Sequence, residues 1–305
     1  MLRPVVPART GQPRLWILIA NGRLSEDRAY VLGHLKSRFA DVEVTRVARD
    51  AAAVPRPSRR PGVILNLIGA WRKSLLDDVD RTGVEFGAPV YQSGAATWRA
   101  TDKRTYLRDY GDAAPASRIA RGPDDVEAAR LALGGDVVVK DPFGGHGVGI
   151  ARLRSPADLP IVARILAEAR TDCGDLIVQR YLEGLVENEH RVVVGRTPGG
   201  GHEIIAAFRR RAAPGSVCGN VSQGGGVAPA ELTDAARAFA LDMARRSDLD
   251  ATALDIAEHG GRFWFIEHNV SFGGIIDHDL MHGIANVARI GDAIEALAVR
   301  GRDAA

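Results

Sequence analysis

Apolar and polar positions in the first hundred residues predict a small parallel α/β unit. The pattern indicates short buried strands and one amphipathic helix. These elements are expected at residues 15–20 (strand), 26–39 (helix), 42–47 (strand), 63–68 (strand) and 89–91 (short strand). Strands and helices at this spacing are typical of a parallel sheet, and we expect the unit to end near residues 94–98.

Beyond residue 100 the pattern mixes single strands, hairpins and helices. The helices are expected at residues 102–110, 124–133, 156–170 and 232–246, with a last one beginning near Ile284. Strands are expected at residues 136–140 and 176–182, and hairpins at 191–194 with 203–208 and at 253–256 with 263–269. This mixture favours an α+β fold over a second doubly wound sheet.

Composition narrows the range of functions. The 305 residues are 46% hydrophobic and 26% charged, with a net charge of +2. This balance gives no overall positive potential that would attract nucleic acid or an anionic membrane. Cys173 and Cys218 are too few and too distant for a disulfide framework, so a reducing cytoplasm is expected. The apolar run at residues 15–20 is too short to span a bilayer.

Oxygen-bearing side chains meet on a predicted hairpin near the C-terminus. Glu267 and Asn269 are two apart on one strand and therefore share a face. If residues 260–262 form a three-residue loop, Asp255 falls opposite Glu267 on that face. Ligands that all present oxygen suit Mg²⁺ or Mn²⁺ that also contacts phosphates. The alternative is a hairpin whose polar residues face solvent.

A glycine-rich run follows the strand that ends at Lys140. Residues 144–149 include Gly144, Gly145 and Gly147, whose backbone N–H groups could approach a phosphate closely. The run matches neither the Walker A nor the dinucleotide-binding spacing, and an ordinary glycine turn is the alternative.

Further charged residues are candidates for a nucleotide site. Lys103 could make a second phosphate contact, although alone it suggests a surface lysine. Glu189 and Arg191 share a strand face and could meet ribose and phosphate, or form an exposed ion pair worth little. Residues 209–211 are three arginines that could clamp a phosphoryl group or a carboxylate, or shield a strand edge.

Three histidines allow a different hypothesis. His278 and His282 have helical i, i+4 spacing and His268 lies nearby, which could indicate zinc. The H-E-x-x-H pattern is absent, so a surface or core role is favoured.

Taken in order, these motifs resemble the ATP-grasp ligases, most closely the RimK-type and glutathione-synthetase-like branch. The likeness covers roughly residues 98–290. It is carried by Asp102-Lys103, Lys140 with the glycine run, Gln179-Arg180-Tyr181-Leu182, Glu189-x-Arg191, Arg210-Arg211, Asn220 with Gly224-Gly225, Asp255 and Glu267-x-Asn269.

The resemblance implies an α/β N-terminal, Rossmann-like domain followed by an α+β ATP-grasp fold of two subdomains. The expected domains are residues 1–97, 98–180 with the glycine-rich lid, and 181–305 with the metal site. It further implies roles for single residues. Phosphate or adenosine would be bound by Lys103, Lys140, Gly144, Gly145, Gly147, Gln179, Arg180, Tyr181, Leu182 and Glu189. Magnesium would be held by Asp255, Glu267 and Asn269, and the reacting phosphoryl group would face Arg191, Arg211 and Asn220.

The implied activity is ATP-dependent ligation of a small carboxylate and an amine through an acyl phosphate, with release of ADP and phosphate. Alternatives are cyclisation or hydrolysis of that acyl phosphate and a non-catalytic ATP-binding module. We expect small-molecule substrates, neither nucleic acid nor membrane as a partner, and a homodimer as the commonest assembly. Cys218 stands where the branch commonly has arginine, which leaves the substrate class open.

Overall fold

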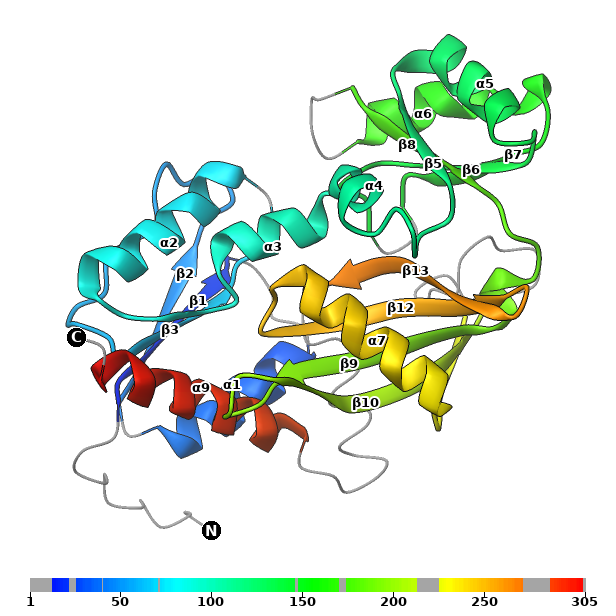
Figure 1. Ribbon diagram of the computed structural model, residues 1–305. Coiled ribbons are helices and arrows are strands. Elements are labelled where there is room, and N and C mark those ends of the chain that lie inside the picture. Colours follow the sequence, from blue (N-terminus) through cyan, green and yellow to red (C-terminus); the bar gives the residue numbers. More distant parts are fainter. Residues whose placement is uncertain are drawn as a thin grey trace. The chain divides into compact units, whose positions relative to one another are not determined.

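The computed structural model describes residues 13–21, 26–39, 41–70, 72–145, 148–169, 174–212, 225–270 and 286–303. These residues form two compact units (Figure 1). The first contains the described residues up to Thr97, the segment Gly195–Glu203 and the C-terminal helix; the second contains Trp98–Val194 and the described part of Ile204–Val270. Within the described residues, no helix is both long and apolar enough to cross a membrane.

A four-stranded parallel sheet forms the centre of the first unit, in the order β2-β1-β3-β4. Its strands and helices are β1 (Leu15–Ala20), α1 (Glu26–Arg38), β2 (Val42–Val47), β3 (Val63–Leu67), α2 (Lys73–Phe86), β4 (Val90–Tyr91) and the start of α3 (Gly94–Thr101). All four predicted strands are present. Central strands β1 and β3 are almost fully buried, which explains their continuous apolar sequence.

Helix α2 was not predicted; its sequence contains a glycine and six charged residues. Gly83 lies in its interior, and a Cβ there would come within 2.6 Å of Val90 Cγ2. The glycine therefore lets the helix lie close to β4, at a cost in helix propensity.

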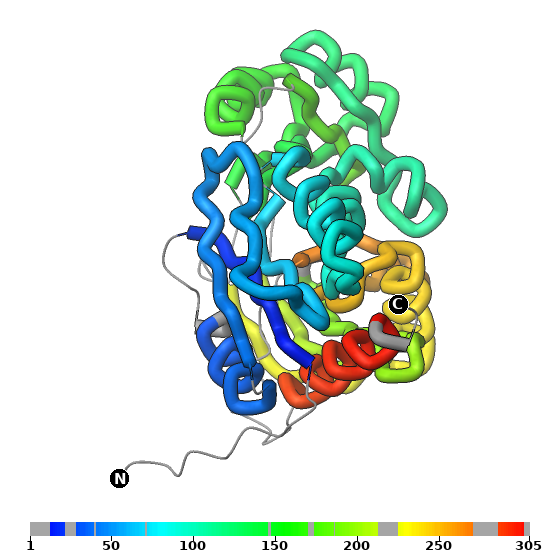
Figure 2. The backbone as a smooth tube through the Cα atoms, turned by 90° about the vertical axis from the view of Figure 1, so that its left-hand side faces the viewer, coloured from blue at the N-terminus to red at the C-terminus, as the bar shows by residue number. Residues whose placement is uncertain are grey.

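The C-terminal helix α9 (Asn286–Asp303) also packs in the first unit, against α1 and β3. Its red ribbon lies beside the blue α1 in both views (Figures 1 and 2). Arg38 of α1 pairs with Asp292 and with Glu295, the latter at 3.0 Å. The predicted assignment of all of residues 181–305 to one C-terminal subdomain therefore differs from how this helix packs, and the subdomain limits stay predictions.

The second unit contains two antiparallel sheets. The four-stranded sheet has the order β5-β8-β6-β7, and α5 and α6 cover an apolar face of it (Figure 1). Its elements are β5 (Ser117–Ala120), α5 (Gly122–Ala132), β6 (Val137–Lys140), β7 (Ile150–Leu153), α6 (Pro160–Glu168) and β8 (Leu176–Arg180).

The other sheet has five strands in the order β11-β10-β9-β12-β13, with α7 packed on β12 and β13. Its elements are β9 (Glu189–Arg196), β10 (His202–Arg211), β11 (Gly226–Pro229), α7 (Asp234–Ser247), β12 (Ala251–His259) and β13 (Arg262–Asn269). Met243 of α7, Phe265 of β13 and Val192 of β9 are among the buried side chains of the core between this helix and the sheet. The predicted helix at residues 102–110 is instead a 3₁₀ turn, Lys103–Thr105, followed by the single-turn α4, Tyr106–Asp109.

Candidate active site

The β12–β13 hairpin brings Asp255 directly opposite Glu267, as the sequence predicted. The reason differs from the prediction. The turn has two residues, Gly260 and Gly261, with φ of +63° and +74°, values that glycine adopts without strain. A bulge between Asp255 and Ile256 then shifts the register by one residue. The shorter turn and the bulge together give the pairing that a three-residue loop would have given.

Asp255 is buried and bound by two arginines. Arg191 of β9 donates from Nε to Oδ1 and from Nη2 to Oδ2, each at 2.8 Å. Arg210 of β10 donates from Nη1 to Oδ2 at 2.8 Å. Burial alone would raise the pKa of Asp255, but the two guanidinium groups outweigh it and hold this pKa below its usual range. The carboxylate is therefore ionised although it is only 1% exposed.

Glu189 shares Arg210 with Asp255. Its Oε1 accepts from Arg210 Nη1 at 2.5 Å. Burial first, and the negative charge of Asp255 second, raise the pKa of Glu189 above its ordinary value. Glu189 thus lies at the carboxylate cluster in this structure, and its predicted contact with ribose stays a prediction.

Glu267 lies closer to solvent than Asp255, with 24% of its side chain exposed. Its Oε2 is 3.6 Å from Nζ of Lys103. Asn269 donates from Nδ2 to Oδ2 of Asp255 and to the carbonyl oxygen of Ala253, both at 3.3 Å. The three predicted metal ligands therefore lie together on one hairpin.

Their chemistry fits a magnesium ion that takes its other ligands elsewhere. Among the described residues, no three His, Cys, Asp or Glu side chains form a metal site on their own. The hairpin offers two carboxylates and one amide oxygen, and magnesium is commonly held by one or two carboxylates together with phosphate and water. Arg191, Arg210 and Lys103 balance the charge of the carboxylates in this structure, so a divalent cation would have to displace one or more of these side chains.

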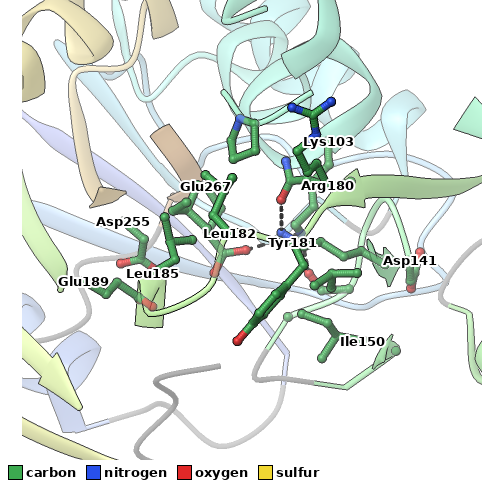
Figure 3. A pocket seen from close by; sticks show the side chains of 18 of the residues that line it. Lys103, Asp141, Ile150, Arg180, Tyr181, Leu182, Leu185, Glu189, Asp255 and Glu267 are labelled. Carbon is green, nitrogen blue, oxygen red and sulfur yellow. Dashed lines mark hydrogen bonds and ion pairs between the residues drawn. The ribbon is translucent and has the colours of Figure 1, made fainter. Parts of the chain in front are cut away.

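A cavity in the second unit brings most of the predicted nucleotide residues together (Figure 3). Its lining draws on both sheets and on the glycine-rich loop. The predicted residues that line it are Lys103, Lys140, Gly144, Gly145, Gln179, Arg180, Tyr181, Leu182, Glu189, Asp255 and Glu267. Pro115, Val138, Ile150, Leu185 and Ile266 add apolar surface that sequence reasoning did not single out.

Both predicted phosphate lysines are held in place by hydrogen bonds. Lys103 donates its backbone N–H to the Pro142 carbonyl at 3.1 Å and its Nζ to the Gly144 carbonyl at 2.6 Å. Lys140 Nζ donates to Oε1 of Gln179 at 2.8 Å. Lys103 is therefore attached to the glycine-rich loop, and Lys140 to the strand β8 that leads into the hinge.

Asp141 anchors the glycine-rich loop at its base. Its N–H donates to the Gly149 carbonyl at 2.8 Å, and its Oδ1 accepts from the Phe143 N–H at 3.0 Å. Gly149 has φ of +69°, and a Cβ there would come within 3.1 Å of the Asp141 Cβ. The two ends of the loop are therefore held together at Asp141. Gly147 lies outside the described residues.

The predicted hinge follows β8. Tyr181 donates its N–H to the Asp136 carbonyl at 3.0 Å, and the Arg152 guanidinium carbon lies 3.5 Å from the centre of the Tyr181 ring. Arg152 also pairs with Asp136 at 2.5 Å and with Glu183 at 2.8 Å. Strand β7 is therefore fixed to the hinge by one arginine.

The consecutive arginines of β10 lie on opposite faces. Arg210 is buried and lines the cavity, whereas Arg211 is exposed and does not line it. Successive strand residues point to opposite faces, and in this structure Arg210, not Arg211, lies beside the carboxylate cluster. The predicted contact of Arg211 with the phosphoryl group stays a prediction. Asn220 lies outside the described residues.

His268 is a buried core residue in this structure. Its Nε2 lies 2.8 Å from the Tyr110 hydroxyl and its Nδ1 lies 3.1 Å from the Thr252 hydroxyl. Burial lowers the pKa of His268 to about 3, so the ring is neutral. Both ring nitrogens are engaged, which favours the core role over zinc; His278 and His282 lie outside the described residues.

Known proteins resemble this chain in sequence and in fold. A sequence profile of the RimK-like ATP-grasp domain matches residues 106–293, more than half of the chain. The chain is 32% identical over 182 residues to the ribosomal protein bS6–L-glutamate ligase of Escherichia fergusonii, covering 57% of either protein. It is 32% identical over 174 residues to a probable alpha-L-glutamate ligase of Klebsiella pneumoniae, covering 55% of this chain and 54% of that one. The chain thus spans little more than half the length of these relatives.

Solved structures share the fold at lower identity. The RimK domain ATP-grasp protein of Sphaerobacter thermophilus has a TM-score of 0.66 at 19% identity, covering 92% of this chain and 99% of that one. The ATP-grasp ligase PsnB, complexed with precursor peptide PsnA2 and AMPPNP, has a TM-score of 0.60 at 19% identity, with coverage of 94% and 98%. D-alanyl-alanine synthetase A of Vibrio cholerae has a TM-score of 0.67 at 14% identity, with coverage of 96% and 99%.

These matches confirm the predicted fold class of an α/β N-terminal region followed by an ATP-grasp fold. ATP with magnesium or manganese, which the resemblance implied, is the cofactor set of this family. The relatives found by sequence are ligases. The chain belongs to the RimK-like ATP-grasp family.

Proposed function

We propose that this chain is an ATP-dependent carboxylate–amine ligase that releases ADP and phosphate. The observation that carries the proposal is the convergence, in one cavity, of two anchored lysines with the paired carboxylates Asp255 and Glu267. The lysines would attract a negatively charged substrate, and the carboxylates would attract a divalent cation that the substrate carries. A magnesium–triphosphate is such a substrate.

Different residues of the chain would bind the base, the phosphates and the magnesium of the nucleotide. The apolar surface of Leu182, Leu185 and Ile266 would hold the base, and backbone groups after β8 would bind its edge. Lys103 and Lys140 would bind phosphate oxygens as point charges. Asp255, Glu267 and Asn269 would hold magnesium, which when bound offsets the charge that develops on the phosphates.

The proposed reaction has two steps. An oxygen of the substrate carboxylate attacks the γ-phosphorus, the bond from that phosphorus to the ADP oxygen breaks, and an acyl phosphate forms. The amine then attacks the acyl carbon, phosphate leaves, and the amine proton passes to the departing phosphate. Arg191 and Arg210 lie beside the carboxylate cluster and would neutralise the transferred phosphoryl group. The protein supplies position and charge, and no protein base is required.

The relatives suggest where to look for substrates. Two are named as L-glutamate ligases, one of them acting on ribosomal protein bS6, and PsnB was solved with a precursor peptide. We therefore propose an amino acid as the amine and a small acid or a peptide carboxylate as its partner, with L-glutamate as the first amine to test.

A phosphate-release screen with mass detection of products tests the proposal. The purified chain is incubated with magnesium and ATP, and amino acids are paired with small acids and short peptides. The expected result is phosphate and ADP in equal amounts, together with a product lighter than acid plus amine by one water. Release without a condensed product would favour hydrolysis, and a product formed from the acid alone would favour cyclisation. ATP binding without release across the panel would favour a non-catalytic module.

A further inference from the structure

Three polar side chains from three strands form a continuous hydrogen-bonded series that ends at Lys140. Lys140 Nζ donates to Oε1 of Gln179 at 2.8 Å. Gln179 Nε2 donates to the Ser117 hydroxyl oxygen at 3.1 Å, and that hydroxyl donates to the Pro115 carbonyl at 2.7 Å. We call Ser117, Gln179 and Lys140 the lysine relay.

Strand pairing explains why these residues meet. Ser117 of β5 lies directly opposite Gln179 of β8. Val138 of β6 lies opposite Gln179 on the other side, and Lys140 is two residues farther along β6 on the same face. Direct and diagonal neighbours on one face of a sheet are within side-chain reach. The relay is therefore a product of sheet register.

Donor counting fixes the orientation of the Gln179 amide. A serine hydroxyl has one proton to donate, and the Ser117 proton goes to the Pro115 carbonyl. The Ser117 oxygen must then accept from Gln179, which places the amide nitrogen toward β5 and the amide oxygen toward Lys140. The reverse amide orientation would set two donors against each other at Lys140. Lys140, which can only donate, and Ser117 therefore favour the same orientation of the Gln179 amide.

The relay lies on a cavity wall. Ser117, Gln179 and Lys140 all line a cavity of about 320 Å³, to which Tyr106 and Ile266 also contribute. Lys140 and Gln179 line the nucleotide cavity as well. Polar groups beside a cavity of that size can turn to water when a partner is removed, so we expect the fold to tolerate the loss of a relay side chain. Its effect is to hold a flexible lysine side chain in one place.

We infer that Gln179 and Ser117 are positioning residues that hold the Lys140 ammonium for a nucleotide phosphate, and that the Gln179 side chain does not bind adenine. The inference rests on the proposed nucleotide site. An unrestrained lysine side chain would lose its rotamer freedom when it binds a phosphate, and this loss of entropy would weaken ATP binding. With Lys140 held in advance, a phosphate meets an ammonium that is already in place.

Titration calorimetry with magnesium and ATP tests the inference in Gln179→Met, Ser117→Ala and the double variant. Gln179→Met should weaken ATP binding about tenfold, the scale of one hydrogen bond to a charged group. Ser117→Ala should weaken it about threefold, because the Gln179 amide loses one of the two hydrogen bonds that hold it in place. The double variant should match Gln179→Met, since the serine acts through the glutamine.

Two controls separate positioning from a general effect on the sheet. Ser117→Thr keeps the hydroxyl and should restore wild-type affinity. Arg118→Ala changes the next residue of β5, which is exposed, and should bind ATP like the wild type. Thermal melting of every variant should stay close to wild type.

The outcomes distinguish the inference from the function on which it rests. Wild-type affinity in Gln179→Met, or single effects that add in the double variant, would overturn the relay while leaving the ATP site intact. Absence of ATP binding by the wild type would remove the nucleotide site itself, and the relay's role with it.

Discussion

Arg191 holds Asp255 by two parallel hydrogen bonds of 2.8 Å, so a predicted metal ligand is already neutralised by a guanidinium. Asp255 is buried and Arg191 is half-buried, and Arg210 adds a third bond to the same carboxylate. A buried carboxylate of this kind would serve both folding and the proposed metal binding. The two predicted acidic ligands therefore differ in what their loss should do.

Glu267→Gln should abolish ADP formation and leave folding nearly unchanged. Glu267 is partly exposed, and its lysine partner is 3.6 Å away, so the change in unfolding free energy should stay within about 0.5 kcal/mol. Asp255→Asn should also abolish ADP formation but destabilise the chain by about 3 kcal/mol, because it leaves the buried Arg210 and the half-buried Arg191 undercompensated. Urea unfolding and coupled ADP assays of both variants check this contrast. Turnover retained by both would remove the metal assignment.

Arg210→Lys and Arg211→Lys compare two neighbouring side chains on opposite faces of β10. Arg210 bonds both Glu189 and Asp255, a geometry that a single ammonium reproduces poorly. We expect Arg210→Lys to lower kcat/KM for ATP at least about tenfold. Arg211 is exposed, so Arg211→Lys should stay within about twofold of wild type. A larger loss from Arg211→Lys would reverse this assignment.

The Arg152–Tyr181 contact should support binding of the nucleotide base. Arg152→Gln removes the cation over the Tyr181 ring and the pairs with Asp136 and Glu183, and should weaken ATP binding about threefold. Arg154→Gln, an exposed change just after β7, is the matched control. Calorimetric titration measures both. Equal affinities would mean that the hinge is positioned without Arg152.

His268 should make the folded chain less stable in acid. Its pKa in the folded chain is lowered to about 3 by burial, against a usual value of 6.5. Between these values the unfolded chain binds a proton that the folded chain does not. Stability is therefore complete above pH 6.5 and falls as the pH drops toward 3, by up to about 1.4 kcal/mol per pH unit.

Urea unfolding of wild type and His268→Gln across this range isolates the histidine. Glutamine can still meet the Tyr110 and Thr252 hydroxyls but does not titrate. The variant should lose the part of the pH slope that comes from His268. Parallel slopes for the two proteins would show that His268 titrates normally in the folded chain.

The sequence predicted the pairing of Asp255 with Glu267 because local periodicity decides which strand residues share a face. It gave the right pairing for a reason that the structure replaces, since turn length and bulge compensate each other. A bulge depends on packing around the strand and leaves little trace in local sequence. The glycine pair at residues 260–261 did indicate where the turn lies.

The contacts of Arg191 and Arg210 could not be predicted in the same way. Both arginines reach Asp255 from other strands, and the order β10-β9-β12 is set by contacts distant in sequence. Strict alternation along β10 was the one available signal: Arg210 shares a face with buried Phe208, whereas Arg211 does not. The Gln179–Ser117 contact likewise required knowledge of which strand lies beside β8.

The central claim is that Asp255, Glu267 and Asn269 hold a divalent cation beside a triphosphate. A crystal structure of the chain with magnesium and a non-hydrolysable ATP analogue measures this directly. We expect magnesium–oxygen distances of about 2.0–2.1 Å to the hairpin oxygens, with Lys103 and Lys140 at the phosphates and Arg191 released from at least one Asp255 oxygen. A nucleotide bound elsewhere, with Arg191 and Arg210 still closed on Asp255, would contradict the account.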